Sequence, residues 1–506
     1  MLAKVYSGTP IGLDGVLIEV EVDVANRGLP FLTVVGLPDK AIGEAKERVK
    51  TAIVNSSFEM PDSRITVNLA PADIPKEGSI FDLPIAVGIL AASGMVDKQA
   101  LNNSLFIGEL SLEGEIREVS GVLPVALMAE KSKIANIFVP EKNVQEACMV
   151  EGLTVYSAKT LADLILHLNK QKIINPSAYL FNEKEEMKEE YEFDFAEIKG
   201  QELAKRALEI AASGGHNIHL TGPPGAGKTM LSRAFPSILP TMDKEERLEV
   251  LKIYSITGLI NIQGFILERP FRKPHHTISR IGLVGGGTKP APGEISLSHR
   301  GVLFLDEFSE FPRSVLEALR QPLEDGVITV SRAAGSLTFP AKFLLIAASN
   351  PCPCGYLGHP KKNCHCLPGT ILRYRKKLSG PLLDRIDLHV DVPPVEEDKL
   401  TSTTKSESSL KVRERVIEAR ERQKKRFKNS PVKINGEMKT KEIKNLCKLS
   451  DEALELLKQA ISRLGLSARS YMRIIKLGQT IADLDKQPII EAAHVAEALQ
   501  YRAKED

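Results

Sequence analysis

The sequence has no surplus of charge of either sign. Its 506 residues include 67 Lys or Arg and 65 Asp or Glu, which gives a formal net charge of +2 at pH 7. Because this balance produces no strong field over the whole molecule, we expect any nucleic-acid surface to be local. Hydrophobic residues make up 43% of the chain and charged residues 26%, values typical of a soluble globular protein with a buried core. The length predicts about two to four domains.

Long hydrophobic runs and a dense set of cysteines are also missing. The longest clean apolar run, residues 83–94, is too short to span a bilayer, and the first residues lack the basic, apolar and cleavage regions of a signal peptide. Six cysteines in a chain of this length do not form a disulfide scaffold. These absences exclude membrane, secreted, fibrous and wholly disordered proteins, and we expect a cytoplasmic protein.

Two polar stretches divide the chain. Residues 183–192 (EKEEMKEEYE) are charged and poor in aliphatics, as in a solvated linker or an exposed helix, and residues 401–409 (TSTTKSESS) are of low complexity. We therefore expect a mixed α+β domain, a charged linker, an α/β core with a parallel sheet, and a C-terminal helical region. The expected bounds are 1–170, 171–194, 195–395 and 396–506.

Hydrophobic periodicity supports this division. In the first block, alternating apolar residues predict strands at 18–24 and 65–69. Helical patterns predict helices at 40–54 and 83–94. Continuous apolar runs between helical stretches predict a parallel sheet covered on both faces; they are 217–221, 301–305 and 343–348. From about residue 410 onward, a 3.6-residue periodicity predicts a helical bundle.

Residues 222–229 carry the strongest local motif. Their sequence, GPPGAGKT, matches G-x-x-x-x-G-K-[ST], with a predicted strand before it and a helical pattern after it. The glycines let backbone N–H groups face phosphate oxygens, while Lys228 would neutralise β/γ-phosphate charge and Thr229 would bind Mg²⁺. The expected nucleotide contacts are Gly222, Pro223, Pro224, Gly225, Ala226, Gly227, Lys228 and Thr229. A chance glycine loop is the alternative, which the complete match and its context disfavour.

Two acids follow the apolar stretch 301–305. Asp306 and Glu307 stand at the carboxyl edge of the expected sheet, where α/β proteins bind ligands. We expect Asp306 to hold Mg²⁺ and Glu307 to polarise the attacking water. Asn350 ends a later apolar run and is either a turn residue or an orienting group for that water. Arg385, flanked by acids, is either a surface ion pair or an arginine finger that reaches a neighbouring subunit's γ-phosphate.

Four of the six cysteines cluster in one short segment, CPCGYLGHPKKNCHC. They form two Cys-x-Cys pairs, Cys352, Cys354, Cys364 and Cys366. Four thiolates in a short loop suit tetrahedral Zn²⁺, with His359 and His365 as substitute ligands. Such a metal would fold a loop that lacks an apolar core. Reduced structural thiols and a redox pair are the alternatives.

One basic stretch overlaps the cysteine segment. Residues 355–381 contain six Lys or Arg and no acid, and Tyr356 and Tyr374 lie between these cations. This composition suits contact with a phosphate backbone and stacked bases. A merely solvated basic loop is an equally simple interpretation.

A second basic stretch, residues 268–300, carries six cations against two anions. Its glycines at 285–287 predict a mobile loop that approaches DNA, and the segment 327–342 predicts a hairpin with Arg332 near its tip. The candidate DNA contacts in the basic stretches and the hairpin are Arg272, Lys273, His275, His276, Arg332, Lys361, Lys362, Arg373 and Arg375.

The phosphate loop, the Asp-Glu pair, the strand-ending Asn, the late Arg and the helical C-terminus together resemble an AAA+ ATPase. The segments RPFRKPHH, PGEISLSHRGVLFLDEF, SNPCPCGY and SGPLLDRIDLHV are similar to those of the magnesium-chelatase-like ComM/YifB family, over nearly the whole chain. The resemblance implies a hexameric ATPase that uses ATP and Mg²⁺. It also implies that Gln201 lies near the adenine and that Arg469 or Arg473, in a sensor-2 helix, reaches the nucleotide.

Residues 70–90 resemble the serine-bearing segment of the Lon-type proteolytic domain, which also occurs as a non-proteolytic module in the RadA recombination ATPase. Ile80 stands where Lon has its catalytic Ser, and Val125 stands near the position of its catalytic Lys. Ser79 is one residue away, and Lys131 lies well past the lysine position. Because a Ser–Lys dyad needs its base within hydrogen-bond reach, we expect a non-proteolytic domain that serves assembly or DNA contact.

Three functions are compatible with these motifs. The first is an ATP-driven DNA motor, which the ComM-like resemblance associates with branch migration in recombination, repair or DNA uptake. The second is a chelatase-type ATPase that remodels a protein partner for metal insertion; by the resemblance, such subunits lack the N-terminal block and the cysteine loop. The third is an ATP-dependent protease, which the missing dyad disfavours. We expect the first, with ATP, Mg²⁺ and a structural Zn²⁺, and with DNA and further copies of the chain as partners.

Overall fold

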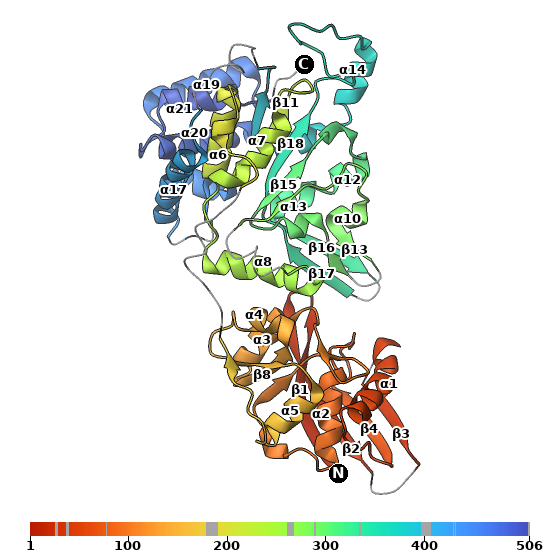
Figure 1. Ribbon diagram of the computed structural model, residues 1–506. Coiled ribbons are helices and arrows are strands. Elements are labelled where there is room, and N and C mark those ends of the chain that lie inside the picture. The colour runs from red at the N-terminus through yellow and green to blue at the C-terminus, as the bar shows by residue number, and fades with distance from the viewer. Residues whose placement is uncertain are drawn as a thin grey trace. The chain divides into compact units, whose positions relative to one another are not determined.

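The computed structural model divides the chain into two units by internal contacts (Figure 1). The first unit comprises residues 1–186 and 247–266, and the second comprises residues 187–246 and 267–506. The structure describes residues 1–503 except 26–28, 37–39, 77, 179–190, 261–267, 288–289, 333–334, 396–405, 429 and 431. Most of the charged stretch 183–192 and part of the polar stretch 401–409 therefore lie outside the described residues.

An eight-stranded mixed sheet organises the first unit, in the order β10-β9-β8-β5-β1-β2-β4-β3. The two strands expected from alternation are confirmed as β2 (Asp14–Val24) and β4 (Arg64–Ala70), which pair antiparallel. The other strands of this sheet are β1 (Leu2–Ile11), β3 (Phe31–Val35), β5 (Ser104–Phe106), β8 (Asn136–Pro140), β9 (Thr154–Ala158) and β10 (Pro176–Ser177). A separate short hairpin joins β6 (Glu109–Leu110) to β7 (Ile116–Arg117).

The helices of the first unit include both helices that the periodicity predicts. They are α1 (Lys40–Asn55) and α2 (Asp82–Ala92), followed by α3 (Val122–Lys131), α4 (Val144–Ala147) and α5 (Leu161–Leu168). Every residue of α2 is buried, which explains an apolar run without an exposed polar face. Its first residue, Asp82, pairs with Arg48 of α1 at 2.8 Å. Burial raises the pKa of Asp82 to about 6 in spite of this cation.

A five-stranded parallel sheet forms the centre of the second unit and confirms the expected α/β core. Its order is β12-β15-β18-β11-β19. The strands are β12 (Phe271–Arg272), β15 (Val302–Leu305), β18 (Leu344–Ser349), β11 (Ile218–Thr221) and β19 (Leu388–Asp391), and all neighbouring pairs run parallel. All four residues of β15 are buried, as expected for a parallel sheet with both faces covered.

Short helices and two hairpins surround this sheet. The helices are α6 (Glu202–Gly214), α7 (Lys228–Ala234), α10 (Arg280–Val284), α11 (Glu294–Leu297), α12 (Arg313–Glu317), α13 (Arg320–Asp325), α14 (Pro368–Arg375) and α15 (Gly380–Leu383); α8 (Lys244–Thr257) crosses the boundary between the units. The expected hairpin at 327–342 is confirmed as β16 (Val327–Arg332) and β17 (Gly335–Pro340). The first two of the glycines at 285–287, which were expected in a mobile loop, form β13 (Gly285–Gly286), which pairs with β14 (Ala291–Pro292).

The C-terminal region is helical, as the periodicity predicts. Its helices are α17 (Ser409–Arg426), α18 (Thr440–Leu446), α19 (Asp451–Leu464), α20 (Ala468–Leu484) and α21 (Ala492–Gln500). Figure 1 shows α17 and α20 beside α6, and one buried hydrophobic cluster contains residues of the sheet and of these helices. Polar contacts also join the two parts, since the ring of His216 contacts the hydroxyl of Thr480 at 2.8 Å. The C-terminal helices thus share the core of the second unit.

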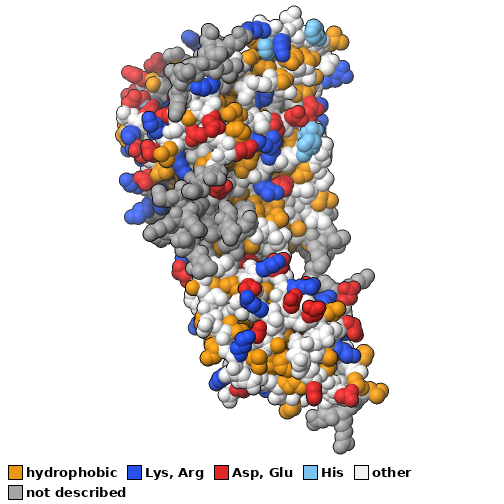
Figure 2. Space-filling view, in the orientation of Figure 1, with side chains coloured by type: hydrophobic (Ala, Val, Ile, Leu, Met, Phe, Trp, Pro, Cys, Tyr) orange, Lys and Arg blue, Asp and Glu red, His pale blue; other side chains and the backbone are white. Residues whose placement is uncertain are grey.

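The described surface matches the balanced composition. On the face shown in Figure 2, basic and acidic side chains are interspersed. Among the described residues, the helices are all too short or too polar to cross a membrane.

Candidate nucleotide site

The phosphate loop follows β11 and leads into α7. Gly225 has φ +78° and Gly227 has φ +89°, conformations that favour glycine. A Cβ atom on Gly222 would lie 2.1 Å from the carbonyl oxygen of Val392, so only glycine fits beside the end of β19. The loop therefore has its curled path because glycine stands at these three positions.

The ammonium of Lys228 lies inside the loop. It donates to the carbonyl oxygens of Gly222 at 2.6 Å and Pro223 at 2.9 Å, and to Oδ1 of Asn350 at 3.2 Å. Burial lowers the pKa of Lys228, while the carboxylate of Asp306 opposes this shift. The structure thus brings the predicted lysine and the predicted asparagine into contact at one point of the sheet edge.

The two predicted acids lie next to the loop. Thr229 Oγ1 donates to Oδ2 of Asp306 at 3.1 Å, so the two expected Mg²⁺ ligands face each other. Glu307 has φ +53°, a strained conformation for a non-glycine residue, and its side chain is 55% exposed. This exposure leaves the carboxylate of Glu307 open to water, as its predicted role requires.

Two residues that were expected to contact DNA lie against these acids. Lys273 Nζ is 3.2 Å from Oδ2 of Asp306, and His276 Nδ1 is 3.0 Å from Oε2 of Glu307. The reason is topological: β12 runs parallel to β15, so the residues after both strands meet at one edge. The sequence analysis did not predict these two contacts, because they depend on β12 lying next to β15 in the sheet.

The other two candidate DNA contacts of this segment, Arg272 and His275, also have partners. Arg272 forms a bidentate ion pair with Glu294, at 2.6 and 2.7 Å. The ring of His275 contacts the hydroxyl of Thr277 at 2.9 Å. In this structure the charged side chains of segment 272–276 thus lie beside Asp306, Glu307 and Glu294.

Gln201 links the phosphate loop to the end of β19. Its side-chain amide donates to the carbonyl oxygen of Ala226 at 3.1 Å and to that of Pro393 at 2.6 Å. The residue itself has φ +62° and directly precedes α6. The resemblance placed Gln201 near the adenine, and the structure places it against the phosphate loop.

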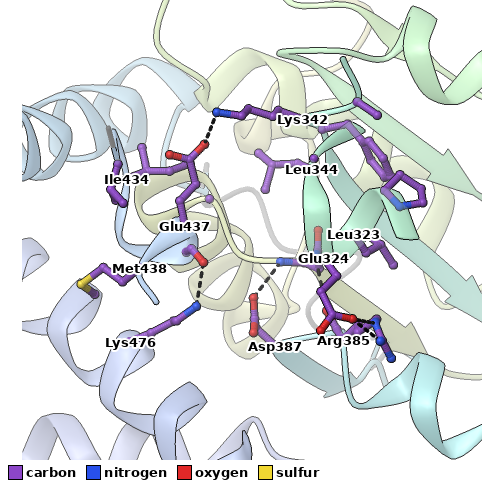
Figure 3. A pocket seen from close by; sticks show the side chains of 18 of the residues that line it. Leu323, Glu324, Lys342, Leu344, Arg385, Asp387, Ile434, Glu437, Met438 and Lys476 are labelled. Atoms are coloured by element: carbon purple, nitrogen blue, oxygen red, sulfur yellow. Dashed lines mark hydrogen bonds and ion pairs between the residues drawn. The ribbon is translucent and has the colours of Figure 1, made fainter. Parts of the chain in front are cut away.

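Three arginines gather at another point of the second unit. Arg385 and Arg469 both pair with Glu324, and Arg473 donates to the carbonyl oxygen of Asp384 at 2.7 Å. All three line a cavity of about 600 Å³ between the sheet domain and the C-terminal helices. Figure 3 shows the pairing of Arg385 with Glu324 inside this cavity.

This cavity lies at the edge of the sheet opposite the phosphate loop. Arg385 precedes β19, whose Leu388 pairs in register with Ile218 of β11, and Asn217 donates to the carbonyl oxygen of Arg385 at 3.3 Å. The phosphate loop follows the other end of β11. The first and last residues of a four-residue strand lie about 10 Å apart.

The four clustered cysteines fit a tetrahedral metal centre. Their sulfur atoms all lie within 4.8 Å of one another, and those of Cys352, Cys354 and Cys364 are 3.4, 3.6 and 3.7 Å apart. A tetrahedral zinc site with Zn–S bonds of about 2.3 Å has sulfur atoms about 3.8 Å apart. Neither His359 nor His365 belongs to this group, and Nδ1 of His359 accepts hydrogen bonds from the backbone N–H groups of Lys361 and Lys362. The donor set that the structure brings together is therefore the four thiols.

The aromatic and basic residues proposed to contact DNA differ in how far their side chains are available to a ligand. The expectation that Tyr374 stacks on bases was wrong, because its side chain is buried. Tyr356 is covered by the ammonium of Lys362, 4.9 Å from the ring centre. Arg373 and Arg375 end α14, and Arg373 donates to the carbonyl oxygen of Gly369. Arg332 is the last residue of β16, at the closed end of the hairpin.

In the first unit, Ser79 has a carboxylate partner. Its hydroxyl donates to Oε2 of Glu109. Ile80 is buried in the core, and so is Val125, on α3. Lys131 is exposed at the last turn of α3. The serine therefore has the wrong partner for a serine–lysine nucleophile.

The parallel sheet, the glycine loop around Lys228 and the paired acids beside Thr229 define a P-loop nucleoside triphosphatase. Three family models match the chain, each in a different region. "Magnesium chelatase, subunit ChlI" matches residues 194–400, "Subunit ChlI of Mg-chelatase" matches 20–143, and "Magnesium chelatase, subunit ChlI C-terminal" matches 406–502.

Relatives match over nearly the full length. The competence protein ComM of Haemophilus influenzae is 46% identical across 99% of this chain and 97% of its own, and YifB of Escherichia coli is 43% identical over the same shares. The magnesium-chelatase subunit ChlI of Euglena gracilis is 24% identical across 41% of this chain. The protein belongs to the ComM/YifB family of magnesium-chelatase-like AAA+ ATPases, as the sequence motifs predict.

Proposed function

We propose that this protein is an ATP-driven DNA motor that moves branched DNA during recombination, repair or DNA uptake. The observation that carries the ATPase part is the meeting of Lys228, Thr229, Asp306 and Glu307 at one edge of the sheet. The DNA part rests on the relationship to a competence protein along the full chain, together with the basic residues beside the cysteine cluster.

Each residue of the site has a defined role in this proposal. The glycine loop cradles the phosphates, Lys228 neutralises their charge, and Thr229 with Asp306 would hold Mg²⁺. When bound there, the metal would supply positive charge against the charge that develops on the phosphates. Glu307 accepts the proton of the attacking water, and Asn350 orients that water.

The proposal requires an assembly of several copies. Within one chain, Arg385 lies at the sheet edge opposite the phosphate loop and so lies far from a nucleotide bound there. A neighbouring copy in a ring would supply this guanidinium to the γ-phosphate, with Arg469 or Arg473 alongside it. We propose a hexamer, in keeping with the family resemblance.

The remaining parts serve DNA handling. We propose that the four cysteines hold a structural Zn²⁺ and that the adjoining cations Lys361, Lys362, Arg373 and Arg375, with the β16–β17 hairpin, contact DNA phosphates. The first unit is proposed to be a Lon-like module without proteolytic activity, because Ser79 is bonded to Glu109.

The test compares ATP hydrolysis without DNA and with four-way junctions, single strands or duplex, at two salt concentrations. We expect the junction to stimulate hydrolysis most strongly, with less stimulation at higher salt because counterions compete for the phosphate contacts. Hydrolysis that responds to none of these DNAs would contradict the motor and favour the alternative. That alternative is a chelatase-type ATPase that remodels a protein partner, which the chelatase family models favour.

A further inference from the structure

The cysteine cluster is joined to the nucleotide site through a short piece of chain. The polypeptide leaves β18 at Ser349, passes Asn350 and enters the cluster at Cys352, whose side chain is fully buried. Asn350 accepts a hydrogen bond from Lys228 of the phosphate loop. The first cysteine therefore lies two positions after a residue that is bonded to the phosphate loop.

A second contact is direct. Gly355, between the two cysteine pairs, packs against Pro224 of the phosphate loop: a Cβ atom on this glycine would lie 2.5 Å from Cδ and 2.8 Å from Cγ of the proline. Gly355 has φ +81°, and its N–H donates to the carbonyl oxygen of Cys352 at 2.9 Å. The backbone of the cluster thus forms one wall of the phosphate loop.

We propose that the metal held by the four cysteines clamps the phosphate loop, so that metal occupancy sets the affinity for ATP. A short loop without an apolar core has a fixed path only while its thiolates share a cation. When the metal leaves, Gly355 no longer packs against Pro224. The chain after Asn350 then no longer has a fixed path. Binding of phosphates by a glycine loop depends on placement of its backbone to within a fraction of an ångström. This inference rests on the proposed nucleotide and zinc sites and names a regulator of the first.

Two glycines of the same loop offer a matched test. Gly355 and Gly358 both have positive φ, at +81° and +75°, so alanine is strained to a similar degree at either position. A Cβ atom on Gly358 meets nothing within 4 Å, whereas one on Gly355 meets Pro224. Gly355→Ala therefore disturbs the contact with the phosphate loop, and Gly358→Ala reproduces only the backbone strain.

The measurements are zinc content by elemental analysis and the Kd of a fluorescent ATP analogue with Mg²⁺, for the full chain. We expect Gly355→Ala to weaken ATP binding about tenfold while zinc stays bound, because a displaced loop loses its fit to the phosphates. Gly358→Ala should match the wild type in both measurements. Equal ATP affinity in the two variants would overturn the clamp.

Removal of zinc from the wild type by a chelator provides the second arm. ATP affinity should fall by a similar factor and return when Zn²⁺ is added back, whereas the same treatment should change Gly355→Ala little, because the two perturbations act on one contact. Purified protein without zinc would contradict the zinc site, and failure to bind ATP at all would contradict the nucleotide site. Zinc and ATP that bind independently of each other would overturn this inference alone.

Discussion

The sharpest test of the proposed ring combines two inactive variants. Lys228→Ala should lose nucleotide binding, and Arg385→Ala should bind ATP but lose about 10³-fold or more of its hydrolysis rate, as arginine fingers contribute. Neither variant alone has a competent site. If the finger acts between subunits, a mixed ring contains sites in which an intact phosphate loop meets an intact arginine.

The expected recovery follows from random assembly. In an equal mixture, half of the subunits have an intact phosphate loop, and half of their neighbours have an intact Arg385, so about a quarter of the interfaces are competent in a head-to-tail ring. Activity should therefore return to as much as about a quarter of the wild-type rate, provided that each interface works independently.

Thermal unfolding of Arg385→Ala separates a folding defect from a loss of the finger. The change breaks an ion pair between a side chain that is 17% exposed and Glu324, which is 49% exposed. Lys486→Ala is the control for loss of a surface cation, because it breaks an exposed pair with Glu418 at 2.9 Å. Mixed with Lys228→Ala, this control leaves every arginine intact, so about half of the interfaces should be competent.

The assay is steady-state ATP hydrolysis after the two variants have been mixed, exchanged and shown to co-assemble by differential tags. Recovery near a quarter of the wild-type rate, and about twice that in the control mixture, would support the finger. A mixture that co-assembles but hydrolyses no more ATP than either parent would refute it, because every condition for the shared site would then have been met.

Three further substitutions test the site and the fold. Glu307→Gln should bind ATP with Mg²⁺ but not hydrolyse it, and normal hydrolysis would remove Glu307 as the base. His276→Ala should lower kcat about tenfold with unchanged ATP affinity, because the 3.0 Å contact that orients Glu307 is lost, whereas His275→Ala should not; equal kcat in the two would sink this role. Arg48→Ala should destabilise the first unit by about 3–5 kcal/mol at pH 8, because Asp82 is left as an uncompensated buried charge. The pKa of Asp82 in the folded chain, already about 6, rises further above its unfolded value, so the folded state regains stability as pH falls through that pKa. Thermal unfolding should then show a smaller loss at pH 5 than at pH 8, and equal losses would contradict the assignment.

Much of the fold could be predicted from periodicity. The strands β2 and β4, the helices α1 and α2, the buried parallel strands and the helical C-terminus all lie where apolar spacing indicates. These elements share one physical feature: each buries a face or a whole strand, and burial leaves a pattern in the sequence. The phosphate loop was equally visible because glycine is required at several of its positions.

The parts that could not be predicted depend on which elements are neighbours. The strand β12 has two residues and no periodic signal, yet its pairing with β15 brings Lys273 to Asp306 and His276 to Glu307. From sequence alone the same residues formed a basic stretch suited to DNA. Likewise, Gly355 and Gly358 are equivalent in the sequence, and only the packing against Pro224 distinguishes them.

The arrangement of the second unit also restricts how copies can associate if the proposed shared site is correct. The phosphate loop follows the carboxyl end of β11, and Arg385 lies beside the start of that strand. In a two-fold dimer the phosphate loop and the arginines would have to share one self-complementary face, which their positions at opposite ends of β11 disfavour. A head-to-tail contact instead places each phosphate loop against the arginines of the next copy, and it repeats until a ring closes. Arg473 lies on α20, so each bound nucleotide would touch the C-terminal helices of the neighbouring copy, and hydrolysis at one site would be transmitted to the next.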